Sequence, residues 1–406
     1  MKILYLHQYF KFPHEPGGTR SFDLATSFIK LGHQVEVISS TSDASYKTSK
    51  NWFKVSLNGL TVHYIYLPYN NNLNYFHRTI VFLKFLWLST FKVISIKCDL
   101  ILSTSTPLTI GIPALIKKFF HKTNFIFETR DIWPEAVIAI GAINNNIIKK
   151  ILYFLEYIIY KNAKYIVPLS IDMKASIISR FPEYDKKILK IIENISEINR
   201  FQKGYEEKNF FLKKKIGFQP RFTVLYAGTF GRVNGISYII DLASKIYSLD
   251  PSIVFVLIGD GVEKKTIIKQ AKEKNILDKN IFILNSVSKK ELPQLYYECD
   301  MGSSFVIPIK ELWANSANKY FDTLAAGKPI LINYEGWQKV EILNEDVGYV
   351  LPIKTDDKAI KGFISYTKNT LLHTRQKENA LNLAKKRYSL NKAVEKYQII
   401  FDKLKN

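Results

Sequence analysis

The segment 313–329 carries the residue types best suited to chemistry on a phosphate. Asn318 and Lys319 open a predicted helix, so the Lys319 ammonium and the helix N-terminus can bind the same phosphate. Asp322 follows about one turn later on the same helix face, where its carboxylate can accept hydrogen bonds from two ribose hydroxyls. Taken alone, Lys319 and Asp322 fit an ordinary surface ion pair equally well. The pattern becomes informative only together with its neighbours.

Two glycine-containing turns follow predicted strands in the same half of the chain. The first runs from Gly228 through Gly231 and Arg232 to Gly235, and the second contains Gly259. Glycine lets backbone N–H groups approach a phosphate, and Arg232 can make charge-assisted bonds to a diphosphate. In an open parallel sheet, ligands bind beyond the carboxyl ends of the strands. Both turns are therefore predicted to lie beside the Lys319 helix, as one donor-binding edge.

A third glycine turn lies near the start of the chain. Gly17 and Gly18 follow the first predicted strand, and Arg20 lies next to them at the start of a helix. The glycines are candidates for approaching a donor phosphate, and Arg20 is assigned to the acceptor side. A plain structural turn fits the pair of glycines equally well.

Two further strand ends in the first half carry polar side chains. One ends in Glu128, Arg130 and Asp131, and the other contains Ser105 within the run 103–107. Both are predicted to line an acceptor site, with Asp131 orienting a sugar or acceptor hydroxyl. The alternative for Asp131 is a cap on the helix that starts near Trp133.

The elements that position these residues alternate between short apolar strands and longer helices, which favours two parallel sheets covered by helices. Strands are expected at Lys2–His7, Gln34–Ser39, Thr61–Leu67, Asp99–Ser103, Asn124–Glu128, Lys164–Leu169 and Lys187–Ile192, and then at Phe222–Ala227, Ile253–Ile258, Ile281–Leu284, Gly302–Val306 and Pro329–Asn333. We expect a first domain over 1–200, a second over 201–385, and a C-terminal helix over 386–406 that packs back on the first domain. The linker is expected within 193–219.

The amino-acid composition indicates which kinds of partner this protein can bind. The 406 residues are 47% hydrophobic and carry a net charge of +22, which indicates a globular protein with an anionic partner. Between Asn74 and Phe125, basic residues alternate with large apolar ones, as is typical of a membrane surface, although a solvated lysine-rich face is the alternative. We expect no signal peptide and no spanning helix, and a cytoplasmic protein on the inner face of the bacterial cytoplasmic membrane. The two cysteines, Cys98 and Cys299, are expected in the core of a protein from a reducing compartment.

Taken together, the segments 228–235, 257–261 and 318–329 resemble the donor half of glycosyltransferase family 4, retaining enzymes of the GT-B fold. The segments 5–20 and 128–135 are similar to those of bacterial O-antigen and capsule transferases, including proposed N-acetyl-L-fucosamine transferases. The resemblance implies that Arg232 and Lys319 hold the donor diphosphate and that Asp322 holds the ribose. Many relatives place a histidine where Asp131 stands here.

Two departures from the family pattern stand out. The first glutamate of the family's Glu-x7-Glu motif falls at Ala314, and the nearest acid, Glu311, becomes the candidate sugar contact. The usual phosphate lysine of the first glycine-rich turn is replaced by Asn234, which leaves Arg232 to serve.

The resemblance implies transfer of a sugar from a UDP-sugar to a polyprenyl-diphosphate-linked saccharide, with the leaving diphosphate taking the acceptor proton. Such a mechanism needs cations and helix dipoles more than protein acids. No Asp-x-Asp motif occurs in a convincing context, so no metal is expected, and the predicted catalytic residues are Asp131, Arg232 and Lys319. Two alternatives stay open at this point: another nucleotide-dependent Rossmann enzyme such as a sugar epimerase, and a basic nucleic-acid-binding protein. Nucleic acid is not expected as a partner because no nucleic-acid motif is present.

Overall fold

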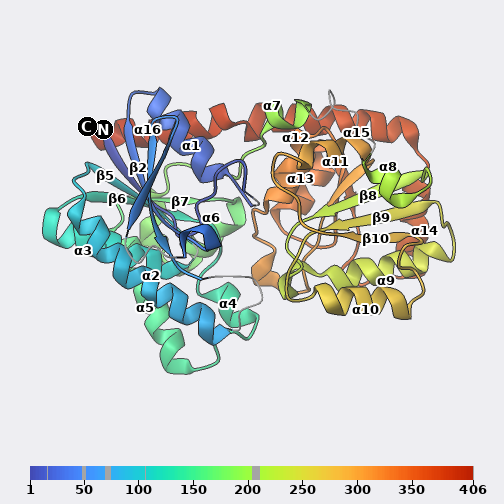
Figure 1. The fold of residues 1–406 in the computed structure, drawn as a ribbon, viewed down its shortest axis with the longest axis horizontal. Coiled ribbons are helices and arrows are strands. Elements are labelled where there is room, and N and C mark those ends of the chain that lie inside the picture. The colour runs from blue at the N-terminus through green and yellow to red at the C-terminus, as the bar shows by residue number, and fades with distance from the viewer. Residues whose placement is uncertain (16, 48–51, 69–74, 106, 204–210, 406) are drawn as a thin grey trace.

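Two mainly parallel β-sheets, each with helices on both faces, lie beside each other in the computed structural model (Figure 1). The structure describes residues 1–405 except 16, 48–51, 69–74, 106 and 204–210, and it leaves out the side chains of residues 75, 76 and 78. The predicted fold class, two Rossmann-like domains, is confirmed.

The first sheet has the strand order β3-β4-β2-β1-β5-β6-β7, and only β3 runs antiparallel to its neighbour. Its strands are β1 (Lys2–Leu6), β2 (Gln34–Thr41), β3 (Phe53–Leu57), β4 (Leu60–Tyr66), β5 (Leu100–Thr104), β6 (Asn124–Thr129) and β7 (Tyr165–Pro168). Its helices are α1 (Arg20–Lys30), α2 (Tyr75–Ser95), α3 (Gly111–His121), α4 (Glu135–Ala139), α5 (Asn146–Asn162) and α6 (Ile171–Arg180).

The second sheet is parallel throughout, in the order β10-β9-β8-β11-β12-β13. Its strands are β8 (Phe222–Ala227), β9 (Ile253–Ile258), β10 (Ile281–Leu284), β11 (Met301–Ser304), β12 (Ile330–Ile332) and β13 (Gly348–Val350). The helices α7 (Ile198–Lys203) and α8 (Phe211–Ile216) precede this sheet in sequence, and α9 (Ile236–Tyr247), α10 (Lys264–Glu273), α11 (Leu292–Glu298), α12 (Asn318–Ala325), α13 (Trp337–Glu345), α14 (Asp357–Tyr366) and α15 (Thr370–Leu383) follow within it.

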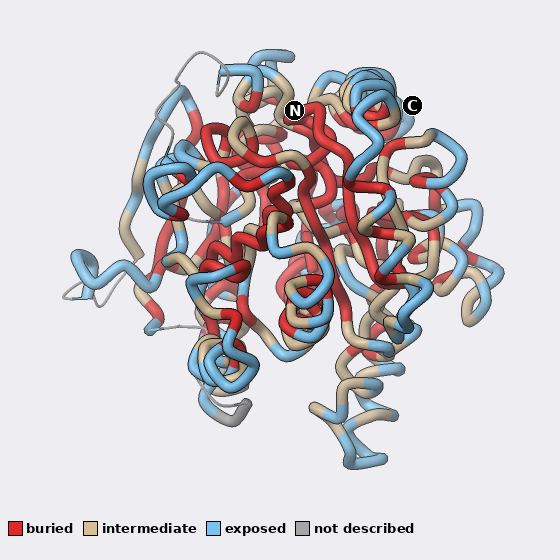
Figure 2. Tube along the Cα trace, turned by 90° about the vertical axis from the view of Figure 1, so that its right-hand side faces the viewer, coloured by how far each residue is buried: buried red, intermediate tan, exposed pale blue. Residues whose placement is uncertain are grey.

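The inner strands of both sheets are buried on both faces, which explains their continuous apolar runs. Every residue of β9 is buried, and Figure 2 shows buried chain concentrated at the centre of the molecule. This uniform burial also made the strands easy to find in the sequence. The expected strand at 187–192 was wrong: that segment has no strand partner, and it leads instead from the first sheet towards α7.

The chain returns to the first domain at its end. After α15 and one π-helical turn (Ala384–Tyr388), α16 (Leu390–Lys405) packs on α1 of the first domain (Figure 1). The rings of Tyr397 and Phe401 lie 5.3 and 5.0 Å from that of Phe28. The predicted crossing of the C-terminal helices to the first domain is confirmed.

Candidate active site

Two adjoining cavities lie between the sheets, and residues of both domains line each of them. Their volumes are about 590 and 770 Å³. Both are lined by Tyr9, Gly18, Thr229, Asn318 and Lys319, so together they form one cleft. The smaller, acceptor-side cavity also contacts the ends of β5 and β6, and the larger, donor-side cavity also contacts the turns after β8, β9 and β10.

Lys319 lies at the start of α12, where both cavities meet. It is half-buried, its Nζ lies 5.2 Å from the centre of the Tyr226 ring, and no carboxylate of the described residues comes within 4.0 Å of it. Burial lowers the pKa of Lys319 to about 8, although nearby Asp322 raises it. A cation and a helix N-terminus are thus held in the cleft with no protein anion in contact, as an anionic ligand requires.

Each predicted glycine turn contributes at least one glycine to the larger cavity, but not every glycine of these turns lines it. Gly228 and Gly259 line the larger cavity, whereas Gly231 lines neither. A Cβ on Gly259 would lie 1.9 Å from the carbonyl oxygen of Gly228, so the two turns pack backbone against backbone. Gly17, with a φ of +125°, lines the larger cavity, and the sequence-adjacent Pro16 lies outside the described residues.

Arg232 and Glu311 lie at the rim of the cleft. Arg232 is exposed at the start of the turn Arg232–Asn234, and Glu311 is exposed in the turn Lys310–Leu312. Neither side chain lines a cavity; the neighbouring Asn234 and Leu312 do. A contact from either side chain to the donor stays a prediction.

Asp322 lines the larger cavity, as predicted, but it is not alone there. Its carboxylate oxygens lie 2.6 and 2.7 Å from Nζ of Lys289, a buried residue in the turn before α11. The sequence analysis missed Lys289, because a lysine in a Lys-Lys pair after a short strand resembles many surface lysines.

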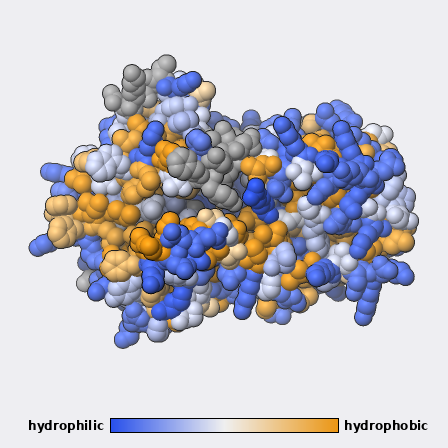
Figure 3. Space-filling view, turned by 90° about the horizontal axis from the view of Figure 1, so that it is seen from below, coloured by the Kyte–Doolittle hydropathy of each residue, from blue (hydrophilic) through white to orange (hydrophobic). Residues whose placement is uncertain are grey.

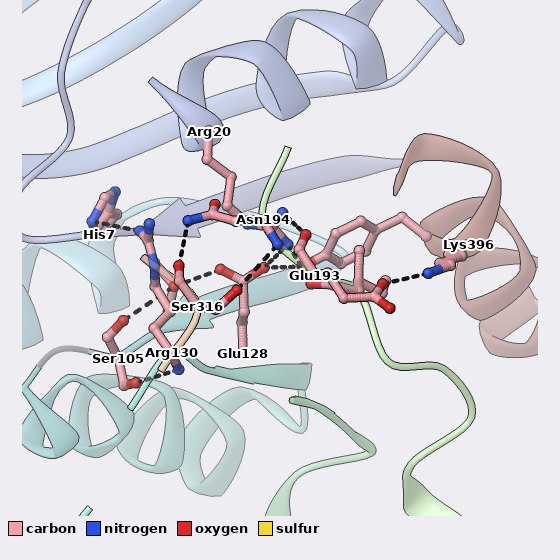
Figure 4. Close-up of polar contacts among 12 residues, drawn as sticks. His7, Arg20, Ser105, Glu128, Arg130, Glu193, Asn194, Ser316 and Lys396 are labelled. Carbon is pink, nitrogen blue, oxygen red and sulfur yellow. Dashed lines mark hydrogen bonds and ion pairs between the residues drawn. The ribbon is translucent and has the colours of Figure 1, made fainter. Parts of the chain in front are cut away.

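On the acceptor side, Ser105, Arg130 and Asp131 line the smaller cavity together with His7. Figure 4 shows His7 and Ser105 beside Arg130. The Arg130 backbone N–H donates to Ser105 Oγ at 2.9 Å. The helix α4 begins at Glu135, so the alternative role of Asp131 as its cap is wrong. Thr106, beside Ser105 in the sequence, lies outside the described residues.

His7 was not predicted as a site residue. Burial and the Arg130 guanidinium hold its pKa well below the usual range, so the imidazole is neutral at pH 7. Arg130 Nη1 lies 3.3 Å from His7 Nε2 and can only donate, so Nε2 accepts and Nδ1 carries the proton. Many relatives of the resembled family have a histidine where Asp131 follows β6; here a histidine lies in the same cavity, but it follows β1. Its position right after an apolar strand was the signal available in the sequence.

Arg20 and Glu128 do not belong to the acceptor site, and their assignment to it was wrong. Both are buried and line neither cavity. Arg20 pairs with Glu128 at 2.8 Å and donates to the backbone oxygens of Ile192 and Glu193 (Figure 4). Glu128 also accepts from Tyr397 of α16. The pair therefore joins α1, β6, the linker and α16.

The two domains contact each other at the wall of the cleft. Asn194 of the linker donates to Ser316 O at 2.8 Å and to Asn318 Oδ1 at 2.6 Å. A Cβ on Gly18 would lie 2.3 Å from Asn318 Nδ2, so a larger residue there would displace the Asn318 side chain. Among the described residues, no group of three or more His, Cys, Asp or Glu side chains is arranged to hold a metal ion.

Comparisons with known proteins agree with this architecture. Residues 208–383 match the family model for glycosyl transferases group 1. No curated protein sequence matches the chain. Sucrose-phosphate synthase from Thermosynechococcus elongatus is similar in structure with a TM-score of 0.76 at 13% identity, over 99% of this chain and 98% of that one. HepE of Anabaena, in complex with UDP and glucose, has a TM-score of 0.70 at 16% identity, over 99% and 100%. The catalytic domain of starch synthase IV from Arabidopsis thaliana, bound to ADP and acarbose, has a TM-score of 0.69 at 12% identity, over 99% of each chain.

The fold is therefore that of the GT-B glycosyltransferases, over the full length of the chain. The family match over the second domain supports a glycosyltransferase.

Proposed function

We propose that this chain is a retaining, metal-independent glycosyltransferase that uses a UDP-sugar as donor. The observation that carries the proposal is Lys319, a half-buried ammonium at a helix N-terminus in a cleft lined by both domains. The UDP complex of HepE supports a UDP-linked donor. The sugar is proposed to be an N-acetylated deoxyhexosamine such as N-acetyl-L-fucosamine, on the sequence resemblance.

In the proposed reaction, the bond between the sugar and the diphosphate breaks while an acceptor hydroxyl forms the new bond on the same face. The leaving diphosphate takes the hydroxyl proton. Lys319 and the N-terminus of α12 stabilise the charge that develops on the diphosphate, and Arg232 joins them from the rim. Asp131 and the neutral His7, in the adjoining cavity, orient the sugar and the acceptor hydroxyl.

The acceptor is proposed to be a polyprenyl-diphosphate-linked saccharide of O-antigen or capsule synthesis, met at the inner face of the cytoplasmic membrane. The support is an apolar surface on the first domain, where α3 packs against both α2 and α5. Its exposed side chains are Leu83, Trp87, Phe91, Phe119, Phe120, Ile147, Ile151 and Phe154. Figure 3 shows hydrophobic residues gathered over this domain.

Basic residues accompany this apolar surface. Lys84, Lys122 and Lys150 are exposed on or next to the same helices. Exposed aromatic side chains beside lysines suit an interface with anionic lipids. The residues of α5 lie outside the stretch 74–125 that the sequence analysis singled out. None of the helices in the described parts of the chain is long and apolar enough to cross a bilayer.

A ligand panel tests the donor. Thermal stabilisation is measured with UDP, GDP, ADP, UDP-GlcNAc, UDP-N-acetyl-L-fucosamine and NAD, each with EDTA or with magnesium. We expect a rise in Tm with the UDP compounds that EDTA does not change and that is clearly smaller in Lys319→Met at the same ligand concentration. A rise with NAD alone, or a requirement for magnesium, contradicts the proposal.

A further inference from the structure

Lys289 occupies an unusual position for a lysine. Its side chain is 4% exposed, it lines the donor-side cavity, and its Nζ contacts both carboxylate oxygens of Asp322. The ammonium also lies 3.8 Å from Glu197 Oε1 and 5.5 Å from the centre of the Phe201 ring. Such a buried ammonium is costly unless it is paired, so its partners define what it does.

The groups around Lys289 come from several elements of both domains. Glu197 precedes α7 and accepts from Thr19 Oγ1 at 2.9 Å, and Arg200 of α7 forms an ion pair with it. Thr19 lies between Gly18 and α1, and its hydroxyl is also 2.8 Å from Asp23. The buried Tyr296 of α11 lies near Asp322. Lys289 therefore connects the donor cavity to the linker and to the first domain.

This arrangement controls the ionisation of Asp322. Burial raises the pKa of Asp322, Lys289 lowers it, and Glu197 raises it. An ionised carboxylate only accepts hydrogen bonds, with lone pairs left over after it binds one ammonium, whereas a protonated acid becomes a donor. Without Lys289, the carboxyl would lose the cation that lowers its pKa, and burial and Glu197 would favour its protonated form further.

We propose that Lys289 is a positioning residue for the donor: it holds the Asp322 carboxylate ionised and oriented in the donor-side cavity, and ties it through Glu197 to the linker and the first domain. This inference rests on the proposed function, because it assigns Asp322 to a bound sugar nucleotide. Lys289 itself needs no contact with the donor.

The affinity of Lys289→Met for a UDP-sugar, measured by calorimetry from about pH 5 to 8, tests the proposal. We expect binding about tenfold weaker than wild type at the acid end, the loss of one hydrogen bond to a charged group, with the deficit shrinking as the pH rises. Lys289→Arg should restore the pH profile because it keeps the charge. Lys290→Met, which removes the exposed neighbouring lysine, is the matched control and should bind as wild type does. A deficit that is equal at every pH, or absent, overturns the proposal.

A second measurement needs no donor. The Tm gap between wild type and Lys289→Met is recorded against pH, alone and in an Asp322→Asn background. A buried carboxyl with a raised pKa costs stability as the pH rises from its unfolded to its folded value, so the gap should widen with pH. In the Asn background most of that widening should vanish. If it persists there, Lys289 does not act through Asp322.

The two measurements separate the two proposals. Should wild type bind no sugar nucleotide, the proposed function fails, but the Tm comparison still decides the effect of Lys289 on Asp322. Should Lys289→Met not fold, Lys289→Gln takes its place, since it keeps a hydrogen-bond donor without the charge.

Discussion

Lys319 places a cation in the donor-side cavity, and burial brings its pKa close to neutral pH. In water a lysine stays protonated well beyond pH 9, but in the cleft its pKa falls to about 8. An anion bound beside the ammonium favours the protonated form. Protonation of Lys319 and binding of the proposed diphosphate ligand are therefore expected to be coupled.

We expect the affinity for a UDP-sugar to be steady below pH 8 and to fall as the pH rises above it, because Lys319 then loses its proton. Calorimetry between about pH 6.5 and 9.5 measures this limb. Lys319→Met should bind about 10- to 100-fold more weakly at pH 7 and should lack the limb. The ionisation of the ligand is the same for both proteins, so a limb that persists in Lys319→Met would assign the titration to the ligand.

The Arg20–Glu128 pair shows how elements distant in sequence are joined. Burial alone would raise the pKa of Glu128, but Arg20, Arg130 and the hydrogen bonds from Arg20 and Tyr397 lower it to about 2. The pair is buried between four elements: α1, β6, the linker and α16. Its role is structural, since neither residue reaches the cleft.

Glu128→Gln should lower the free energy of unfolding by about 3–5 kcal/mol, because it leaves the Arg20 guanidinium buried and unpaired. Urea unfolding at pH 7 measures this loss. The pKa of Glu128 lies below its ordinary value of 4.5, so its contribution is present above that pH and is lost as the pH falls towards 2. The difference between wild type and variant should shrink in that range. Equal stability at pH 7 would contradict the structural role.

The elements themselves were largely readable from the sequence. The strands of the second domain were expected within one or two residues of their true ends, since each is a short apolar run bounded by polar residues. The exceptions lie at sheet edges: β3 alternates apolar and polar residues, and β13 has only three residues, all partly exposed. In α3, Gly111 and Pro113 look like a turn, yet both are buried in the first turn of the helix.

On the scale of the whole molecule, the neighbouring helices α2, α3 and α5 carry exposed apolar side chains. Leu371 on α15 of the second domain is 84% exposed as well, but it lies far along the chain from these helices. It supplies a control of the same chemical kind for the membrane proposal.

We expect the double variant Trp87→Ser, Phe91→Ser to bind vesicles of phosphatidylcholine and phosphatidylglycerol at least about tenfold more weakly than wild type, because burying each large apolar side chain contributes about 1.5–3 kcal/mol. Co-sedimentation measures this loss, and Leu371→Ser should bind as wild type does. Binding should need the anionic lipid and weaken with salt. An equal loss of vesicle binding in the double variant and in Leu371→Ser would refute a membrane partner. So would a wild-type protein that dimerises in solution and does not bind vesicles.

Local sequence patterns were enough to predict the fold class and to bring Gly228, Gly259 and Lys319 to one cleft. Buried parallel strands must be apolar throughout, and glycine turns and a helix start with a lysine leave a local pattern in the chain. Tertiary structure decided the rest: that His7 shares a cavity with Asp131, that Lys289 pairs with Asp322, and that Arg20 and Glu128 are enclosed away from the cleft. Local patterns show which elements form, but burial and charge pairing arise between elements far apart in sequence. A charged residue at a strand end can face a ligand or another helix, and only packing selects between them.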